Sequence, residues 1–116
     1  MKGLYRVGVV SILFLMGVSE VRSEQVVFSE IMYHPAGGRP EYIEICNNTA
    51  TTFDIADWRL TDGVDYAFPS FSAEDTDRTF LKPFERILLC GVDEATLRAA
   101  YSVPATTRVY GPWAGN

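Results

Sequence analysis

The sequence predicts an all-β domain, a sandwich or barrel, with one short helix. Extended runs rich in β-forming residues alternate with Gly, Pro and Asn turns at near-regular spacing. Residues 42–46 (YIEIC) alternate in polarity, as expected of a strand with one buried face. Only residues 93–101 have a helical pattern, and a length of 116 residues suits one small domain.

The first expected strands come before and after a loop rich in glycine and proline. Residues 26–33 (VVFSEIMY) are rich in β-formers. Residues 34–40 (HPAGGRP) form a loop, because two prolines stop strands and a Gly-Gly pair permits a tight reversal. Residues 42–46 return as the second strand, and residues 47–51 (NNTAT) make a polar turn.

Residues 53–60 (FDIADWRL) form the next expected strand, and its alternation changes phase at Ala56-Asp57, which predicts a bend or bulge. A short strand follows at residues 66–68 and ends at Pro69. Residues 80–84 lead into residues 86–90 (RILLC), a continuous apolar run typical of a fully buried strand.

The helix is expected at residues 93–101 (DEATLRAAY). Asp93 is a suitable N-cap, and Leu97 and Tyr101 lie one turn apart on one face. A last short strand is expected at residues 108–110.

The N-terminus has the three-part pattern of a secretory signal. Lys2 and Arg6 precede a 12-residue uncharged apolar run at residues 7–18, and the small residues Val21 and Ser23 suit a cleavage site. We therefore expect a signal peptide at residues 1–23 and a mature domain at 24–116, located in the periplasm, at the cell surface or in the medium. A spanning helix needs about 20 apolar residues, so no stable membrane anchor is expected after cleavage. An uncleaved anchor is the alternative.

The charge of the chain disfavours nucleic acid as a partner. Removing residues 1–23 takes away one acidic and three basic residues, so the formal net charge changes from −5 to −7. Such a chain repels phosphate backbones unless it has a local basic stripe. Arg78, Lys82 and Arg86 come nearest to one, but acidic residues are interspersed among them.

Two cysteines, Cys46 and Cys90, form a candidate disulfide, because an exported chain meets an oxidising compartment. The alternative is two small buried thiols, since a bridge needs Cα atoms within about 7 Å. Two cysteines and one histidine fall short of a zinc site.

The chain's one histidine, His34, lies in a sequence neighbourhood rich in carboxylates. Glu30, Glu41, Glu44 and Asp62 could join it at a metal, but their spacing fits no zinc or calcium pattern. Ser29 and His34 could belong to a hydrolytic triad, but no Gly-x-Ser-x-Gly elbow marks the serine. We expect no metal, no cofactor and no catalytic residue.

Aromatic and loop residues are the better candidates for binding. Trp58 is expected in the core, because an inward Trp of a sandwich strand usually packs there. Asn47 begins an N-x-T sequon, which matters only in a host that glycosylates such sites. The candidate partner-binding residues lie in two loops and are Tyr33, His34, Pro35, Arg39, Tyr110 and Trp113.

The order of the motifs is more specific than any one of them. SEIMYHP, EYIEICNNT, FDIADWRLTDGVDYAFP, FLKPFERILLCGVD and VYGPWAGN follow one another over about residues 26–116. This ordered set resembles the bacterial lamin-tail domain. The resemblance implies an immunoglobulin-like β-sandwich in an exported bacterial protein. It also implies a non-catalytic binding module, with an unknown protein or glycan ligand at the cell surface.

The chain departs from the family pattern at its C-terminal end. In the family, further strands normally follow the Gly-Pro-aromatic stretch, whereas this chain stops at Asn116. We therefore expect an incomplete sandwich whose closing strands are missing, and a fragment with unpaired edges. The alternative function is an accessory domain of a larger secreted enzyme, hydrolase or spore-coat kinase-like, whose catalytic part lies elsewhere.

Overall fold

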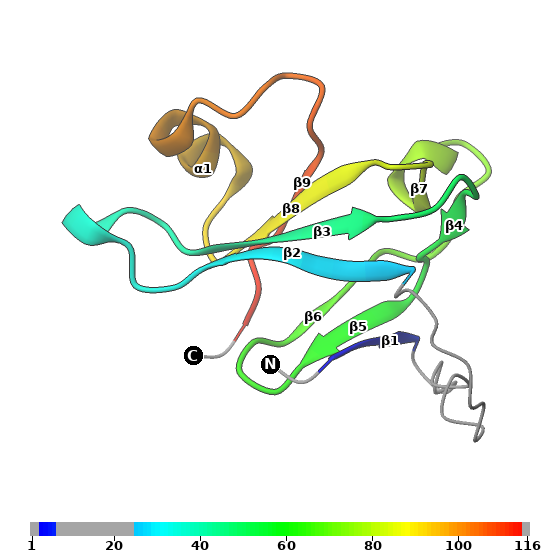
Figure 1. Ribbon diagram of the computed structural model, residues 1–116, viewed down its shortest axis with the longest axis horizontal. Helices are drawn as coiled ribbons and strands as arrows, with labels where there is room; N and C mark the ends of the chain where they lie inside the picture. Colours follow the sequence, from blue (N-terminus) through cyan, green and yellow to red (C-terminus); the bar gives the residue numbers. More distant parts are fainter. Residues whose placement is uncertain (1–2, 7–24, 115–116) are drawn as a thin grey trace.

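The computed structural model describes residues 3–6 and 25–114, and most of its regular structure is strand (Figure 1). No helix in this part of the chain is long and apolar enough to cross a membrane. The predicted cleavage position after Ser23 lies outside the described residues. The strands are β1 (Gly3–Arg6), β2 (Val26–Met32), β3 (Tyr42–Asn47), β4 (Phe53–Asp54), β5 (Trp58–Thr61), β6 (Tyr66–Ala67), β7 (Phe80–Leu81), β8 (Arg86–Cys90) and β9 (Val109–Tyr110).

The described strands form three sheets. One layer of the sandwich is the four-stranded sheet in the order β2-β3-β8-β9, the other contains the three-stranded sheet β1-β5-β6 (Figure 1), and β4 and β7 form a separate two-stranded sheet. The pairs β2·β3 and β3·β8 are antiparallel, whereas β8 and β9 are parallel. A parallel pair needs a crossover connection, and here it is helix α1 (Glu94–Tyr101). The sequence predicted the last strand but not its direction.

The helix begins as predicted. The Asp93 side chain accepts a hydrogen bond from the Thr96 backbone N–H at 2.9 Å, which satisfies one of the free donors at the helix start. Leu97 is fully buried and packs with Leu88 and Cys90 in a small cluster between α1 and the sheet. Helix α1 therefore covers the sheet face that points away from β5 and β6 (Figure 1).

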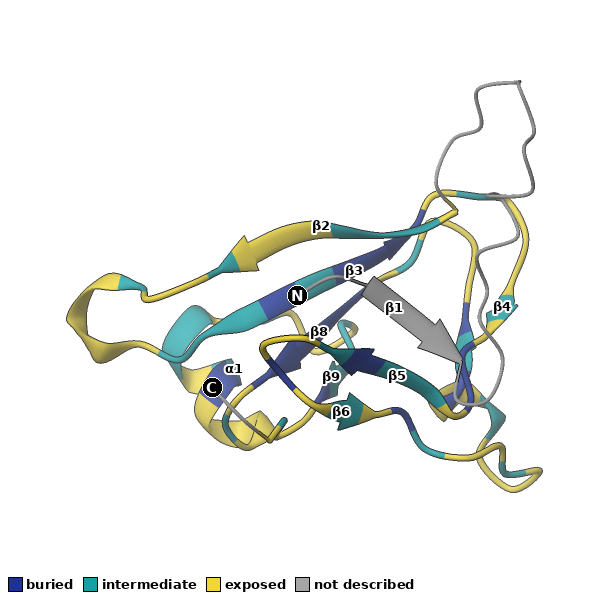
Figure 2. Ribbon diagram, turned by 90° about the horizontal axis from the view of Figure 1, so that it is seen from below, coloured by how far each residue is buried: buried dark blue, intermediate teal, exposed yellow. Residues whose placement is uncertain are grey.

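The main core lies between the two layers. Figure 2 shows buried residues on β3, β8 and β5, the strands at the centre of the sandwich. Trp58 packs against this core and is half-buried, in agreement with its expected place. The buried members of the core are Ile43, Ile45, Ile55, Leu60, Val64, Phe68, Leu81, Ile87, Leu89 and Tyr110.

The break in the alternation of apolar residues at residues 56–57 is a turn rather than a β-bulge. Asp57 has a positive φ of 60°, and the Trp58 N–H donates to the Ile55 carbonyl at 3.0 Å, so the chain makes a turn there. Strand β4 before the turn pairs with β7, and strand β5 after it pairs with β1 and β6. The single strand expected at residues 53–60 is therefore two strands in different sheets.

The candidate disulfide is absent, because Cys46 and Cys90 are both free buried thiols. In the antiparallel ladder of β3 and β8, Cys46 is opposite Arg86 and Cys90 is opposite Tyr42. The two cysteines therefore lie at opposite ends of the ladder, at a separation of about 13 Å for four residues of strand. A bridge needs Cα atoms within about 7 Å, so the register excludes it.

Asn47, the last residue of β3, joins the larger sheet to the β7–β8 segment. Its side chain is fully buried, and its amide nitrogen donates to the carbonyls of Thr51, Leu81 and Lys82 at 2.8, 3.1 and 2.9 Å. Its amide oxygen accepts from the backbone N–H and the hydroxyl of Thr49 at 2.9 and 2.8 Å. The sequon asparagine is therefore inaccessible to glycosylation in the folded chain.

Replacing Asn47 with Ala is expected to lower the free energy of unfolding by about 2–4 kcal/mol, because the change leaves several buried polar groups without a partner. Chemical denaturation of the full chain measures this value. The control is Asn48→Ala, at the exposed neighbouring position, for which we expect a change within about 0.5 kcal/mol. Equal effects at the two positions would contradict the role of Asn47.

Phe84 has an unusual combination of backbone geometry and exposure. The Glu85 N–H donates to the Lys82 carbonyl at 3.1 Å, which closes a turn with Pro83 and Phe84 at its centre. Phe84 has a φ of 57° in that turn, where glycine is the favoured residue after proline. Its side chain is 64% exposed, so burial does not offset the backbone strain.

We expect Phe84→Gly to be more stable than Phe84→Ala by about 1 kcal/mol. Both variants lose the ring, but only glycine relieves the strain of the left-handed backbone conformation. The matched control is exposed Glu74, where we expect Ala to be at least as stable as Gly. Thermal unfolding of the four variants gives both orders of stability. The same order at both positions would show that the Phe84 backbone is not strained.

Candidate partner-binding loop

The loop that joins β2 to β3 extends from the body of the sandwich (Figure 1). It contains four of the predicted binding residues, Tyr33, His34, Pro35 and Arg39. A short 3-10 turn at Ala36–Gly38 reverses the chain. Gly37 and Gly38 have φ values of 74° and 67°, which explains why a Gly-Gly pair is used at this reversal. We call residues 33–41 the β2–β3 loop.

A carboxylate braces the first half of the β2–β3 loop. One oxygen of Glu41 accepts a hydrogen bond from the His34 backbone N–H at 3.1 Å, and the same oxygen lies 3.0 Å from Nδ1 of the His34 ring. His34 has a left-handed φ of 47°, so this double contact stabilises a turn that a non-glycine residue adopts at some cost.

Helix α1 braces the second half of the loop. The Arg39 guanidinium donates to the Ala100 carbonyl near the C-terminal end of α1, where the helix dipole favours a positive charge. Its central carbon also lies 4.0 Å from the centre of the Tyr101 ring, a cation–π contact. The Tyr101 hydroxyl donates to the Pro40 carbonyl at 2.7 Å.

The braced loop presents an exposed aromatic side chain. Tyr33 is 69% exposed, and the centres of the Tyr33 and His34 rings lie 3.8 Å apart. Ile31, near the end of β2, is 49% exposed. Aromatic rings of this kind offer apolar area and a polar tip at a low cost in conformational entropy.

The other two predicted binding residues are far less accessible than expected. Tyr110 is 6% exposed and belongs to the core, where its hydroxyl accepts from Arg108 at 2.8 Å and donates to the Arg78 carbonyl at 2.9 Å. Trp113 is half-buried and packs against the same core. Tyr110 is therefore a structural residue, because strand β9 pairs with β8 and turns its ring inward.

A scan of protein families matches the model described as Lamin Tail Domain to residues 21–111. The chain belongs to the lamin tail domain family. A search of the curated proteins and a search of the solved structures found no match. Lamin tail domains are immunoglobulin-like interaction domains, in agreement with the two-layered strand architecture and the single helix of this chain.

The acidic residues of this lamin tail domain have separate partners. Glu41 contacts His34, Glu30 accepts from the Tyr42 hydroxyl at 2.5 Å, and Glu44 accepts from Ser29 and Arg86, both at 2.7 Å. Within the described residues, no group of three or more His, Cys, Asp or Glu side chains could hold a metal ion. Ser29 and His34 likewise bind different carboxylates and form no nucleophile–base pair.

A β-bulge explains why Glu30 is part of this surface network. In an uninterrupted strand, the two-residue period would place Glu30 on the same face as Phe28 and Met32. The ladder of β2 and β3 shifts register between Phe28 and Glu30, so Phe28 packs against the core while Glu30 contacts Tyr42 on the outer face.

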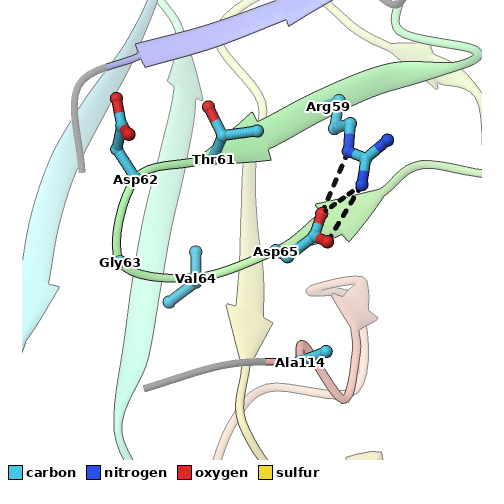
Figure 3. Close-up of a pocket in the computed structure, with 7 residues that line it drawn as sticks. All are labelled: Arg59, Thr61, Asp62, Gly63, Val64, Asp65 and Ala114. Atoms are coloured by element: carbon cyan, nitrogen blue, oxygen red, sulfur yellow. Dashed lines mark hydrogen bonds and ion pairs between the residues drawn. The ribbon is translucent and has the colours of Figure 1, made fainter.

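A shallow hollow lies at the turn between β5 and β6 (Figure 3). The Arg59 guanidinium there makes a two-pronged contact with the Asp65 carboxylate, with distances of 3.0 and 2.9 Å. The Arg59 guanidinium and the Asp65 carboxylate therefore serve as hydrogen-bond partners for each other. The hollow is lined by Arg59, Thr61, Asp62, Gly63, Val64, Asp65 and Ala114.

The Tyr42–Glu30 contact has a measurable consequence. Burial and the hydrogen bond to the Glu30 carboxylate raise the pKa of Tyr42 from 10.0 to about 12. Because the folded state favours the protonated phenol, this contribution to stability is present below pH 10 and is lost as the pH rises from 10 to about 12.

We expect Glu30→Gln to lower the pKa of Tyr42, since the amide removes the negative charge beside the phenol. An NMR titration of the tyrosine ring carbons measures the shift. Glu74→Gln, at an exposed position with no contact to Tyr42, is the control and is expected to leave this pKa unchanged. An unchanged pKa in Glu30→Gln would contradict the contact.

Proposed function

We propose that this lamin tail domain is an exported, non-catalytic binding module that contacts a partner protein through the β2–β3 loop. One observation carries the proposal. Tyr33 is 69% exposed on a loop that Glu41 and Arg39 fix at both ends. Membership of an interaction-domain family supports a binding role.

The bracing is what makes exposure of Tyr33 useful for binding. Ordering a mobile loop on association costs about 0.5–1.5 kcal/mol for each immobilised flexible side chain. A loop that Glu41, Arg39 and Tyr101 already hold avoids much of that cost. Large aromatic residues are also enriched among those that dominate binding energy. Tyr33 would be the anchor, and His34, Pro35 and Arg39 would complete the contact surface.

The binding role is tested by placing a photo-crosslinking amino acid at position 33 of the full chain in the cell of origin. We expect a discrete adduct with one protein, which is lost when Arg39→Ala loosens the loop. The control places the same crosslinker at exposed position 74, on the loop before the Thr76–Arg78 turn.

Identical adducts from positions 33 and 74, or none from either, would contradict this role of the loop. Binding to a glycan array that Tyr33→Ala abolishes would replace the protein partner with a carbohydrate.

The export part of the proposal rests on the signal pattern of residues 1–23. We expect the protein in the fraction outside the inner membrane, with Glu24 as its first residue. N-terminal sequencing of the purified protein measures this. A cytoplasmic protein that starts at Met1 or Lys2 would refute export.

The same loop could serve a larger exported protein, such as a secreted enzyme for which this domain is an accessory. The resemblance to bacterial lamin-tail domains, which implies a module that accompanies catalytic or adhesive domains in exported proteins, supports this second role. Reading the gene beyond codon 116 distinguishes the two. An open frame that leads into a catalytic domain favours the accessory role, and a stop codon favours the free-standing module.

A further inference from the structure

Strand β5 is paired on both sides. Its neighbour β6 belongs to the expected mature domain, whereas its neighbour β1 lies within residues 1–23, the expected signal peptide. On one side, β6 pairs through Arg59 with Ala67 and Leu60 with Tyr66. On the other side, β1 pairs in antiparallel register from Gly3 opposite Thr61 to Arg6 opposite Trp58, and Figure 1 shows the two strands side by side. The strand order is β1-β5-β6, so the β5 edge that β1 covers has no other described neighbour.

Packing of its side chains against the core holds strand β5 in place. Leu60 is fully buried, and Trp58 packs against the core. Arg59 is fixed by its contact with Asp65. A strand held in this way presents its main-chain N–H and C=O groups in a fixed row, which is the requirement for adding another strand to a sheet.

The ends of β5 are acidic. Asp57 immediately precedes the strand, Asp62 immediately follows it, and both side chains are exposed. The strand that pairs there belongs to a basic segment, because Lys2 precedes Gly3 and Arg6 ends β1. The antiparallel register places Arg6 opposite Trp58, the residue that follows Asp57 in the chain. Charge complementarity therefore favours an extended strand with basic residues near both of its ends.

We propose that the outer edge of β5 is a docking site for an extended peptide strand that has basic residues near its ends. Gly3–Arg6 occupies the site in a chain that keeps its N-terminus. Once that segment is removed, the site accepts a strand from another polypeptide by β-sheet addition. Removal of Gly3–Arg6 rests on the proposed export, whereas the docking of a strand at the outer edge of β5 does not. This site is distinct from the β2–β3 loop.

The test uses the full chain and a synthetic peptide with the sequence of residues 2–7 (KGLYRV). In the Leu4→Pro/Tyr5→Pro variant, proline removes main-chain donors from β1 and frees the edge of β5. We expect this variant to bind the peptide at least about tenfold more tightly than the unaltered chain, in which the tethered strand competes.

The peptide control reverses both charges, with Glu in place of Lys2 and of Arg6, and we expect it to bind at least about threefold more weakly. The expected pattern supports the proposal. Equal binding of the peptide to the variant and to the unaltered chain would overturn it, and so would no binding at about 1 mM.

A second measurement does not depend on whether the proline variant folds. Amide hydrogen exchange in the unaltered full chain is compared between residues 58–61 and residues 70–75. We expect the outward amides of β5 to be protected like those of a paired strand, because β1 covers them. Exchange as fast as that of the 70–75 loop would overturn the pairing. Neither experiment involves Tyr33 or export, so either proposal can fail alone.

Discussion

The fold depends most on the buried side-chain amide of Asn47. Strand β3 is the central antiparallel strand of the larger sheet, with β2 on one side and β8 on the other. At its C-terminal end, Asn47 binds three carbonyls from two different segments and ties the larger sheet to β7 and to the residue that follows β7. A fully satisfied amide in a dry interior fixes one arrangement of the chain, because any shift leaves buried polar groups unpaired.

With one end of β3 fixed, the β2–β3 loop at the other end becomes a defined surface. Glu41 holds His34, and helix α1 holds Arg39 and Pro40 through its last turn. The charges of this region are used to hold the backbone rather than to gather around a reacting centre. The exposed Tyr33 ring is therefore better suited to recognition than to catalysis. The stretch SEIMYHPAGGRPEYIE contains carboxylates and a histidine, but they act as turn and strand contacts.

Local patterns in the sequence predict the existence of most elements, because period-two alternation, prolines and an N-cap are local signals. Asp93, residues 42–46 and residues 86–90 are examples. What the sequence could not predict depends on contacts between distant residues. The change of sheet at Asp57, the bulge before Glu30 and the inward turn of Tyr110 follow from pairing registers. The bracing of the loop by Arg39 joins residues that are 61 positions apart.

The binding role of the β2–β3 loop depends on its rigidity, which backbone order parameters from NMR relaxation measure. We expect values of about 0.85 for the amides of residues 33–41 that are not proline, equal to those of β3. Values below about 0.6 in that loop, with β3 remaining rigid, would show that Tyr33 is part of a mobile segment rather than a fixed binding surface.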